Sequence, residues 1–121
     1  MVTPEENKQL VLRRIEAWNA GDADAVARLT HPDFFDHGRG WRAGERLEPL
    51  DIVAEDDRVV VRARVGGNGR PVQEIHIWRL LDGLVVEHWQ SADDHASLRR
   101  PGPAGGSASP EPRRARGEGR P

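Results

Sequence analysis

The hydrophobic positions near the start of the chain follow the period of a helix. Val11, Ile15 and Trp18 are spaced four and three residues apart, which places them on one helical face. The segment 3–6 reads Thr-Pro-Glu-Glu, the pattern of a capping box with proline at the first helical position. Gly21 suits the left-handed residue that closes a helix. We therefore predict a helix that starts within 3–6 and ends just before Gly21.

A second, shorter helix is predicted over 23–29. Asp22 can cap this helix, and Val26 and Leu29 are its apolar positions. The residues at 31–32 are His-Pro, and the residue before a proline avoids helical geometry. The helix is therefore expected to end there.

Later in the chain the hydrophobic residues alternate with polar ones, as they do in half-buried strands. This pattern predicts strands over 47–53, 58–65, 72–80 and 84–90. The stretch 38–46 shows neither period and is predicted to be a loop. Two helices followed by a strand meander are typical of an α+β fold, in which the helices pack on one face of a curved antiparallel sheet.

The last two predicted strands flank an Asp-Gly pair at 82–83, a strong signal for a two-residue hairpin turn. Such a turn predicts these pairs across the hairpin: Leu81 with Leu84, Trp78 with Glu87, Ile77 with His88 and His76 with Trp89. One face of the hairpin would then carry Glu74, His76, Trp78, Leu80, Val85, Glu87, Trp89 and, if the strand continues, Asp93. Aromatic walls with a few titratable groups suit a small-molecule pocket. The alternative is a solvent-facing surface with half-covered tryptophans.

The end of the chain has a different composition. From residue 101 onward no aliphatic or aromatic side chain is larger than that of alanine. Such a segment cannot bury enough apolar surface to offset the entropy of ordering it. We therefore predict one domain over 1–98 and a disordered tail over 99–121. The tail holds arginines without aromatic residues to stack on bases, so no nucleic-acid partner is predicted.

The composition also excludes several classes of protein. The sequence has no cysteine, which rules out disulfides, thiol nucleophiles and thiolate metal sites. It shows no apolar run long enough to cross a membrane and no signal-peptide pattern, so a cytoplasmic protein without a membrane partner is expected. His88, Asp94 and His95 lack the spacing of a metal site, and no metal is predicted.

Several segments together resemble the SnoaL-like polyketide cyclases of the NTF2-like superfamily. They are Asn-Lys-Gln-Leu at 7–10, Glu-Ala-Trp-Asn-Ala-Gly-Asp at 16–22, Pro-Asp-Phe-Phe-Asp-His at 32–37, His-Ile-Trp-Arg-Leu-Leu-Asp-Gly at 76–83, Glu-His-Trp at 87–89 and Asp-Asp at 93–94. Their order and spacing match over about 1–38 and 51–100. The resemblance implies a cone of curved sheet closed by helices, with a pocket inside and often a dimer. The chain is shorter than the family between His37 and Ala54, where further helices would form one wall.

The resemblance also implies a chemistry. In the cyclases an acidic residue shortly after the last tryptophan acts as general acid and base in an aldol closure, helped by a pocket histidine and without metal or cofactor. Asp93 matches the acid by position, and His76 is the histidine on the predicted pocket face. Asp93 would equally suit the cap of a short helix, and His76 a hydrogen-bonded sheet histidine. The residues predicted to contact substrate are His37, Trp78, Glu87, Trp89 and Trp18.

These expectations favour a small-molecule enzyme without a cofactor. The predicted function is a cyclase or isomerase that moves a proton on a polyketide-like carbonyl compound. The alternative is a non-catalytic ligand-binding or dimerisation module, because the short segment after His37 would leave the pocket open to water. A homodimer is expected, since the helices cannot cover both faces of the sheet. The face predicted to be buried in it carries Ile75, Ile77, Leu84 and Val86.

Overall fold

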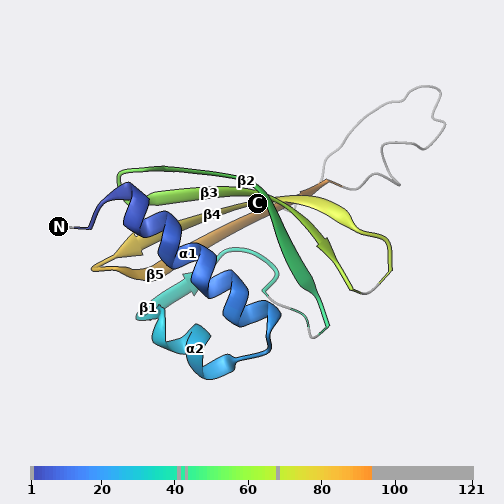
Figure 1. Ribbon diagram of the computed structural model, residues 1–121, viewed down its shortest axis with the longest axis horizontal. Coiled ribbons are helices and arrows are strands. Elements are labelled where there is room, and N and C mark those ends of the chain that lie inside the picture. Colours follow the sequence, from blue (N-terminus) through green and yellow to red (C-terminus); the bar gives the residue numbers. More distant parts are fainter. Residues whose placement is uncertain (1, 41, 43, 68, 94–121) are drawn as a thin grey trace.

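The computed structural model describes residues 2–40, 42, 44–67 and 69–93. The elements in this part are α1 (Pro4–Asn19), α2 (Ala23–Arg28), β1 (Thr30–Asp36), β2 (Arg46–Glu55), β3 (Arg58–Gly66), β4 (Val72–Leu81) and β5 (Leu84–Asp93). The strands form one curved sheet in the order β1-β5-β4-β3-β2, and α1 lies across one of its faces (Figure 1). We call this the inner face and the opposite one the outer face. The predicted α+β class is confirmed.

The first helix begins as the sequence predicts. Thr3 Oγ1 accepts a hydrogen bond from the Glu6 backbone N–H at 3.1 Å, and Glu6 Oε1 accepts one from the Thr3 N–H at 2.8 Å. Pro4 occupies the first turn, where its missing N–H has no helical partner to lose. Gly21 follows the helix with a φ of 72°, in the left-handed region that glycine favours. These local interactions fix where α1 starts and ends.

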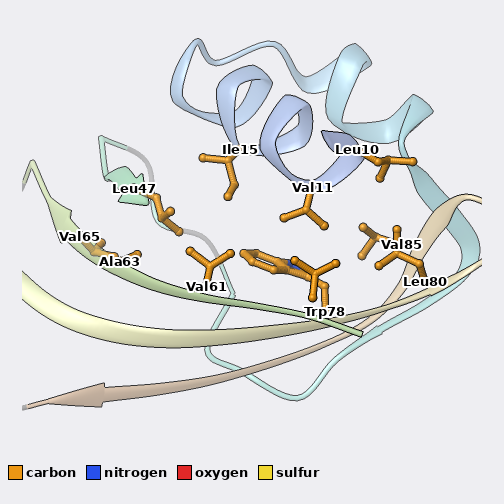
Figure 2. Packing of buried hydrophobic residues seen from close by; sticks show 11 residues of the cluster. Leu10, Val11, Ile15, Leu47, Val61, Ala63, Val65, Trp78, Leu80 and Val85 are labelled. Atoms are coloured by element: carbon orange, nitrogen blue, oxygen red, sulfur yellow. The ribbon is translucent and has the colours of Figure 1, made fainter. Parts of the chain in front are cut away.

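The core lies between α1 and the inner face of the sheet. Leu10, Val11 and Ile15 point down from the helix onto side chains from β3, β4 and β5 (Figure 2). The alternation predicted for 58–65 is confirmed, because every second side chain of β3 is buried. Trp78 lies beneath the helix near the centre of this cluster and is 4% exposed. Packing of α1 on the sheet therefore forms the apolar floor on which the site is built.

The first strand was not predicted. β1 begins at Thr30, where a turn was expected, and it runs parallel to β5 at the edge of the sheet. Pro32 is tolerated there because an edge strand has one side without ladder partners. The register between β1 and β5 also shifts between Thr30 and Phe35, around the proline. The sheet is therefore mixed, and the expected purely antiparallel sheet was wrong at this edge.

The predicted pairing of β4 with β5 was wrong beyond the turn. Leu81 pairs with Leu84 as expected, and the Asp-Gly turn has the positive φ angles of its type, 54° and 77°. A bulge then leaves Val86 without a partner. The pairs that follow are Arg79 with Glu87, Trp78 with His88, Ile77 with Trp89 and His76 with Gln90. Because one extra residue reverses the side of every later side chain, His88 joins the inner face and Trp89 the outer one.

Two predictions fall outside the described residues. The predicted tail begins beyond residue 93, and its state stays a prediction. Asp93 is the last residue of β5 and pairs with Gln73, but its side chain is not described. Within the described residues, no helix has the length and apolar character needed to cross a membrane.

Candidate active site

A narrow cavity lies between α1, β1 and the inner face of the sheet. Its volume is about 40 Å³. Its aromatic walls are Trp18 from α1, Phe34 from β1 and Trp78 from β4. Its polar lining comes from these elements, from β5 and from the connection between β1 and β2, which contributes Arg39 and Glu45, so segments distant in the sequence meet there. The cavity therefore brings aromatic walls and titratable groups together.

A chain of hydrogen bonds crosses the floor of this cavity. His88 Nδ1 lies 2.8 Å from Asp36 Oδ1, and His88 Nε2 lies 2.8 Å from His76 Nδ1. His76 Nε2 in turn lies 2.8 Å from Glu74 Oε1. The four side chains come from β1, β5 and β4, whose registers place them next to one another. We call Asp36, His88, His76 and Glu74 the carboxylate–histidine chain.

The geometry of this chain fixes its number of protons. Each of the three contacts needs one hydrogen between its two heavy atoms. Ionised carboxylates supply none, so the two imidazoles together carry three N–H hydrogens. One ring is therefore neutral and the other is protonated. The shared hydrogen lies between His76 Nδ1 and His88 Nε2, and its position decides which ring carries the charge.

The surroundings decide where that charge lies. Burial lowers the pKa of His88, and the nearby Asp36 carboxylate opposes this only in part. Burial would raise the pKa of Asp36, but the hydrogen bond and charge of His88 hold it below its ordinary value. Glu74 behaves in the same way, with His76 and Arg39 lowering its pKa against the effect of burial. These shifts favour the ionised form of both carboxyls and the neutral form of His88.

The two ends of the chain differ in how many hydrogen bonds they accept. Glu74 Oε1 accepts from His76 and from Gln90 Nε2 at 2.9 Å, and its Oε2 accepts from Arg39 Nη2 at 3.1 Å. Asp36 Oδ1 accepts from His88 and from the Gly38 N–H at 2.8 Å. Asp36 Oδ2 has no hydrogen-bond partner among the residues that the structure describes. Glu74 is thus a saturated anchor, and Asp36 faces the cavity with one free oxygen.

Comparison with solved structures places this arrangement in a known fold. AclR, a candidate hydroxylase from Streptomyces galilaeus, is 24% identical over 84% of this chain and 98% of its own, with a TM-score of 0.64. An NTF2-like protein of unknown function from Cytophaga hutchinsonii is 18% identical over 82% and 97%, with a TM-score of 0.66. A candidate SnoaL-like polyketide cyclase from Jannaschia sp. is 21% identical over 78% and 90%, with a TM-score of 0.64.

This chain has the NTF2-like fold. The resemblance predicted from the sequence is confirmed at that level, since the similar structures include NTF2-like and SnoaL-like proteins. The sequence itself matches no protein-family model and no curated protein. The relationship therefore rests on the arrangement of helices and strands, and the chemistry has to be argued from the side chains of this chain.

The NTF2-like sheet brings only some of the predicted site residues together. His76, Trp78 and Trp18 line the cavity. His37 lies instead against the outer face, where its ring stacks on that of Trp89 with centroids 4.9 Å apart. Its Nε2 lies 2.8 Å from Glu87 Oε2. The bulge at Val86 explains this separation, because it turns positions 87 and 89 away from the cavity.

Sequence reasoning missed two members of the chain, Asp36 and His88. Asp36 enters the sequence prediction only as part of the segment 32–37, because the sequence predicts no strand between the second helix and residue 38. His88 was assigned to the opposite face, because a simple hairpin without a bulge puts it there. The segment 87–89, Glu-His-Trp, did signal polar and aromatic groups at the right place in the chain. Which of the three points inward depends on one inserted residue.

All four ring nitrogens of the histidine pair are engaged by the hydrogen bonds described above. A metal ion would have to displace at least one of those bonds to find an imidazole ligand. In the described part of the chain, no group of three or more His, Cys, Asp or Glu residues could hold a metal ion. What this arrangement offers chemically is proton transfer at Asp36.

Proposed function

We propose that this chain is a small-molecule enzyme of the SnoaL-like type, a cyclase or isomerase that moves a proton beside a carbonyl group. The observation that carries the proposal is the carboxylate–histidine chain on the floor of an aromatic cavity. Two structures of similar fold are described as a candidate polyketide cyclase and a candidate hydroxylase, which supports small-molecule chemistry in this cone.

The reaction would begin at Asp36 Oδ2. This oxygen takes the proton from the carbon next to the substrate carbonyl, so the C–H bond breaks and an O–H bond forms. The electron pair of the broken bond moves into the carbonyl to give an enolate. Asp36 then returns the proton to a different carbon in an isomerisation, or to the new alkoxide after an aldol closure. No oxidant or cofactor is needed to balance these steps.

The remaining members of the chain would position Asp36 and set its basicity. His88 donates to Asp36 Oδ1 and keeps Oδ2 turned to the cavity. His76 supplies the hydrogen that His88 Nε2 accepts, and Glu74 holds His76 in place. The two imidazoles share one hydrogen, so the pair can adjust to each protonation state of the carboxyl.

Asp93 remains a second candidate for the acid and base. Its role was implied by the resemblance, and it stays a prediction. The two assignments separate by mutation: Asp36→Asn and Asp93→Asn each keep the shape of the side chain and remove the base. The variant that loses turnover identifies the carboxylate.

The experiment needs no knowledge of the natural substrate. Aromatic 1,3-dicarbonyl compounds are incubated with the protein in D₂O, and proton NMR follows the loss of the hydrogen between the carbonyl groups. We expect catalysed exchange that falls about 10²- to 10⁴-fold in Asp36→Asn. Asp33→Asn is the matched control, because Asp33 is an exposed carboxylate of the same strand. Exchange that is no faster than in buffer across the panel would argue against an enzyme of this kind.

A non-catalytic ligand-binding module is the second candidate, and two observations favour it. The cavity is narrow, and the pKa of Asp36 is lowered, which weakens it as a base. In this case a ligand would perturb the NMR signals of cavity residues without any exchange at carbon. The same experiment therefore separates the two functions.

A homodimer and a cytoplasmic location complete the proposal. The outer face of the sheet exposes apolar side chains, with Phe35 and Val53 each 61% exposed and Ile75 40% exposed. A second copy could cover this face. Val86 was expected on it, but Val86 is buried at the bulge. The cytoplasmic location rests on the sequence alone.

A further inference from the structure

Arg14 is a buried cation on the roof of the cavity. It projects from α1 and is only 5% exposed. Its Nε donates to Thr30 Oγ1 at 3.0 Å, and its guanidinium carbon lies 5.3 Å from the Trp18 ring centre and 5.5 Å from that of Phe34. In the described ranges no carboxylate forms an ion pair with it. The side chain is thus held between two aromatic rings, and the Asp36 carboxylate across the cavity compensates its charge only in part and without direct contact.

Packing alone does not explain this residue. Burying a charge without an ionic partner costs folding free energy, and an apolar side chain of similar size would fill the same space without that cost. Burial lowers the pKa of Arg14 to about 10, so it still carries its charge at neutral pH. A buried charge that is retained at this cost in folding free energy indicates an anionic ligand that binds from solution.

The terminal nitrogens of Arg14 are open to such a partner. Among described side chains, Asn7 Oδ1 is the only buried nitrogen or oxygen atom that is sealed from water and lacks a hydrogen bond. The Nη1 and Nη2 atoms of Arg14 have no hydrogen bond to any described residue, so they must remain within reach of a water-sized sphere. Because Arg14 lines the cavity and is otherwise covered, the cavity provides that access.

We propose that Arg14 binds an anionic oxygen of the ligand, a carboxylate or the enolate-like oxygen of a flat conjugated ring. Trp18, Phe34 and Trp78 provide the apolar walls for such a ring. Asp36 lies on the sheet side of the cavity and repels the anion from there, so the ligand is oriented with its charge toward α1. This inference rests on the proposed function only in taking the cavity as the ligand site, and it does not require catalysis.

Matched probes test the inference directly. Benzoate and benzamide have nearly the same shape and differ in charge, and their affinities at pH 7 are measured by NMR titration, with the Arg14 Nε–H signal as a local reporter. We expect benzoate to bind at least about tenfold more tightly, as charge-assisted hydrogen bonds to guanidinium predict. Arg14→Gln should remove this preference by weakening benzoate binding much more than benzamide binding. Arg13→Gln is the matched control, because Arg13 is the exposed neighbour on the same helix.

Two further variants keep the result interpretable. Arg14→Lys retains a positive charge and should keep part of the preference, even though it cannot form the two parallel bonds of an arginine. Asp36→Asn removes the proposed base and should keep or strengthen the preference for benzoate, so loss of catalysis and loss of anion binding are separate readouts. Equal affinity for the two probes, a preference that survives in Arg14→Gln, or the absence of binding by both probes would overturn the inference.

Discussion

At the scale of single residues, the site depends on where one hydrogen lies between two imidazoles. His76 and His88 are chemically alike, but they differ in their second partner. His88 contacts Asp36, which has a free oxygen, and His76 contacts Glu74, which already accepts three hydrogen bonds. Asp36 is left as the group whose charge can change.

The pKa shifts of the chain predict how stability depends on pH. The pKa of His88 lies below its ordinary value of 6.5, so the unfolded state takes up this proton first and stability falls as the pH drops below that value. The pKa values of Asp36 and Glu74 are also lowered, so their contribution is present above 3.8 and 4.5 and is lost at more acidic pH. Urea unfolding at a series of pH values should show both losses.

The variant His88→Gln isolates the first of these losses. Glutamine can still donate a hydrogen bond to Asp36 but does not titrate, so the decline between pH 7 and pH 5.5 should become shallower. His31→Gln is the control, because His31 is a partly exposed histidine that lies outside the carboxylate–histidine chain. An unchanged slope in His88→Gln would mean that His88 does not titrate as its burial implies.

Removal of His76 should be costly for stability. The imidazole is buried, and both of its nitrogens are hydrogen-bonded. His76→Ala would take one hydrogen-bond donor from the buried Glu74 carboxylate, which keeps Arg39 and Gln90, and would leave His88 Nε2 without its partner. Leaving a buried polar group without its partner costs about 1–3 kcal/mol. A drop well below 1 kcal/mol in urea unfolding would show that His76 does not hold the carboxylate–histidine chain together.

At the scale of elements, the parts set by neighbouring residues could be predicted. The capping box at Thr3, the alternation in β3 and the Asp-Gly turn each depend on side chains a few residues apart. β1 could not be predicted, because the strand that it pairs with in the described residues, β5, lies some fifty residues later in the chain. The bulge at Val86 leaves no local signal either, although it decides which residues reach the cavity.

The bulge offers a prediction of its own. Deleting Val86 removes the extra residue of the bulge but keeps the pairs Arg79 with Glu87 and Trp78 with His88, so His88 should still face the cavity. The carboxylate–histidine chain should therefore survive the deletion. We expect the cost to be that of the buried Val86 side chain, about 1.5–3 kcal/mol, as measured by urea unfolding. Deletion of Gly69, in the exposed connection between β3 and β4, is the control and should cost less. A deletion of Val86 that prevents folding would show that the bulge itself is needed for the sheet.

At the scale of the whole molecule, the two faces of the sheet differ in whether a helix covers them. α1 covers the inner face of the sheet and α2 packs mainly against α1, whereas no described helix lies on the outer face (Figure 1). Arginines and carboxylates solvate part of that face, as in the pair Arg62 Nε to Asp51 Oδ2 at 2.7 Å. Between these charged side chains the apolar ones are exposed to solvent. The molecule therefore has one face that holds the site and one that is suited to a partner.

The proposed homodimer follows from this second face and is tested by mass in solution. Sedimentation at micromolar concentration should give about twice the 13.5 kDa of one chain. The double variant Phe35→Glu with Ile75→Glu puts two charges on the outer face and should sediment as a monomer, because charges at the centre of an apolar interface are not solvated there. Leu81→Glu is the control: Leu81 is 43% exposed but lies at the hairpin end, away from the centre of the face. A wild-type protein with the mass of one chain would rule the homodimer out. A partner other than a second copy of this chain would then be needed to cover the exposed Phe35.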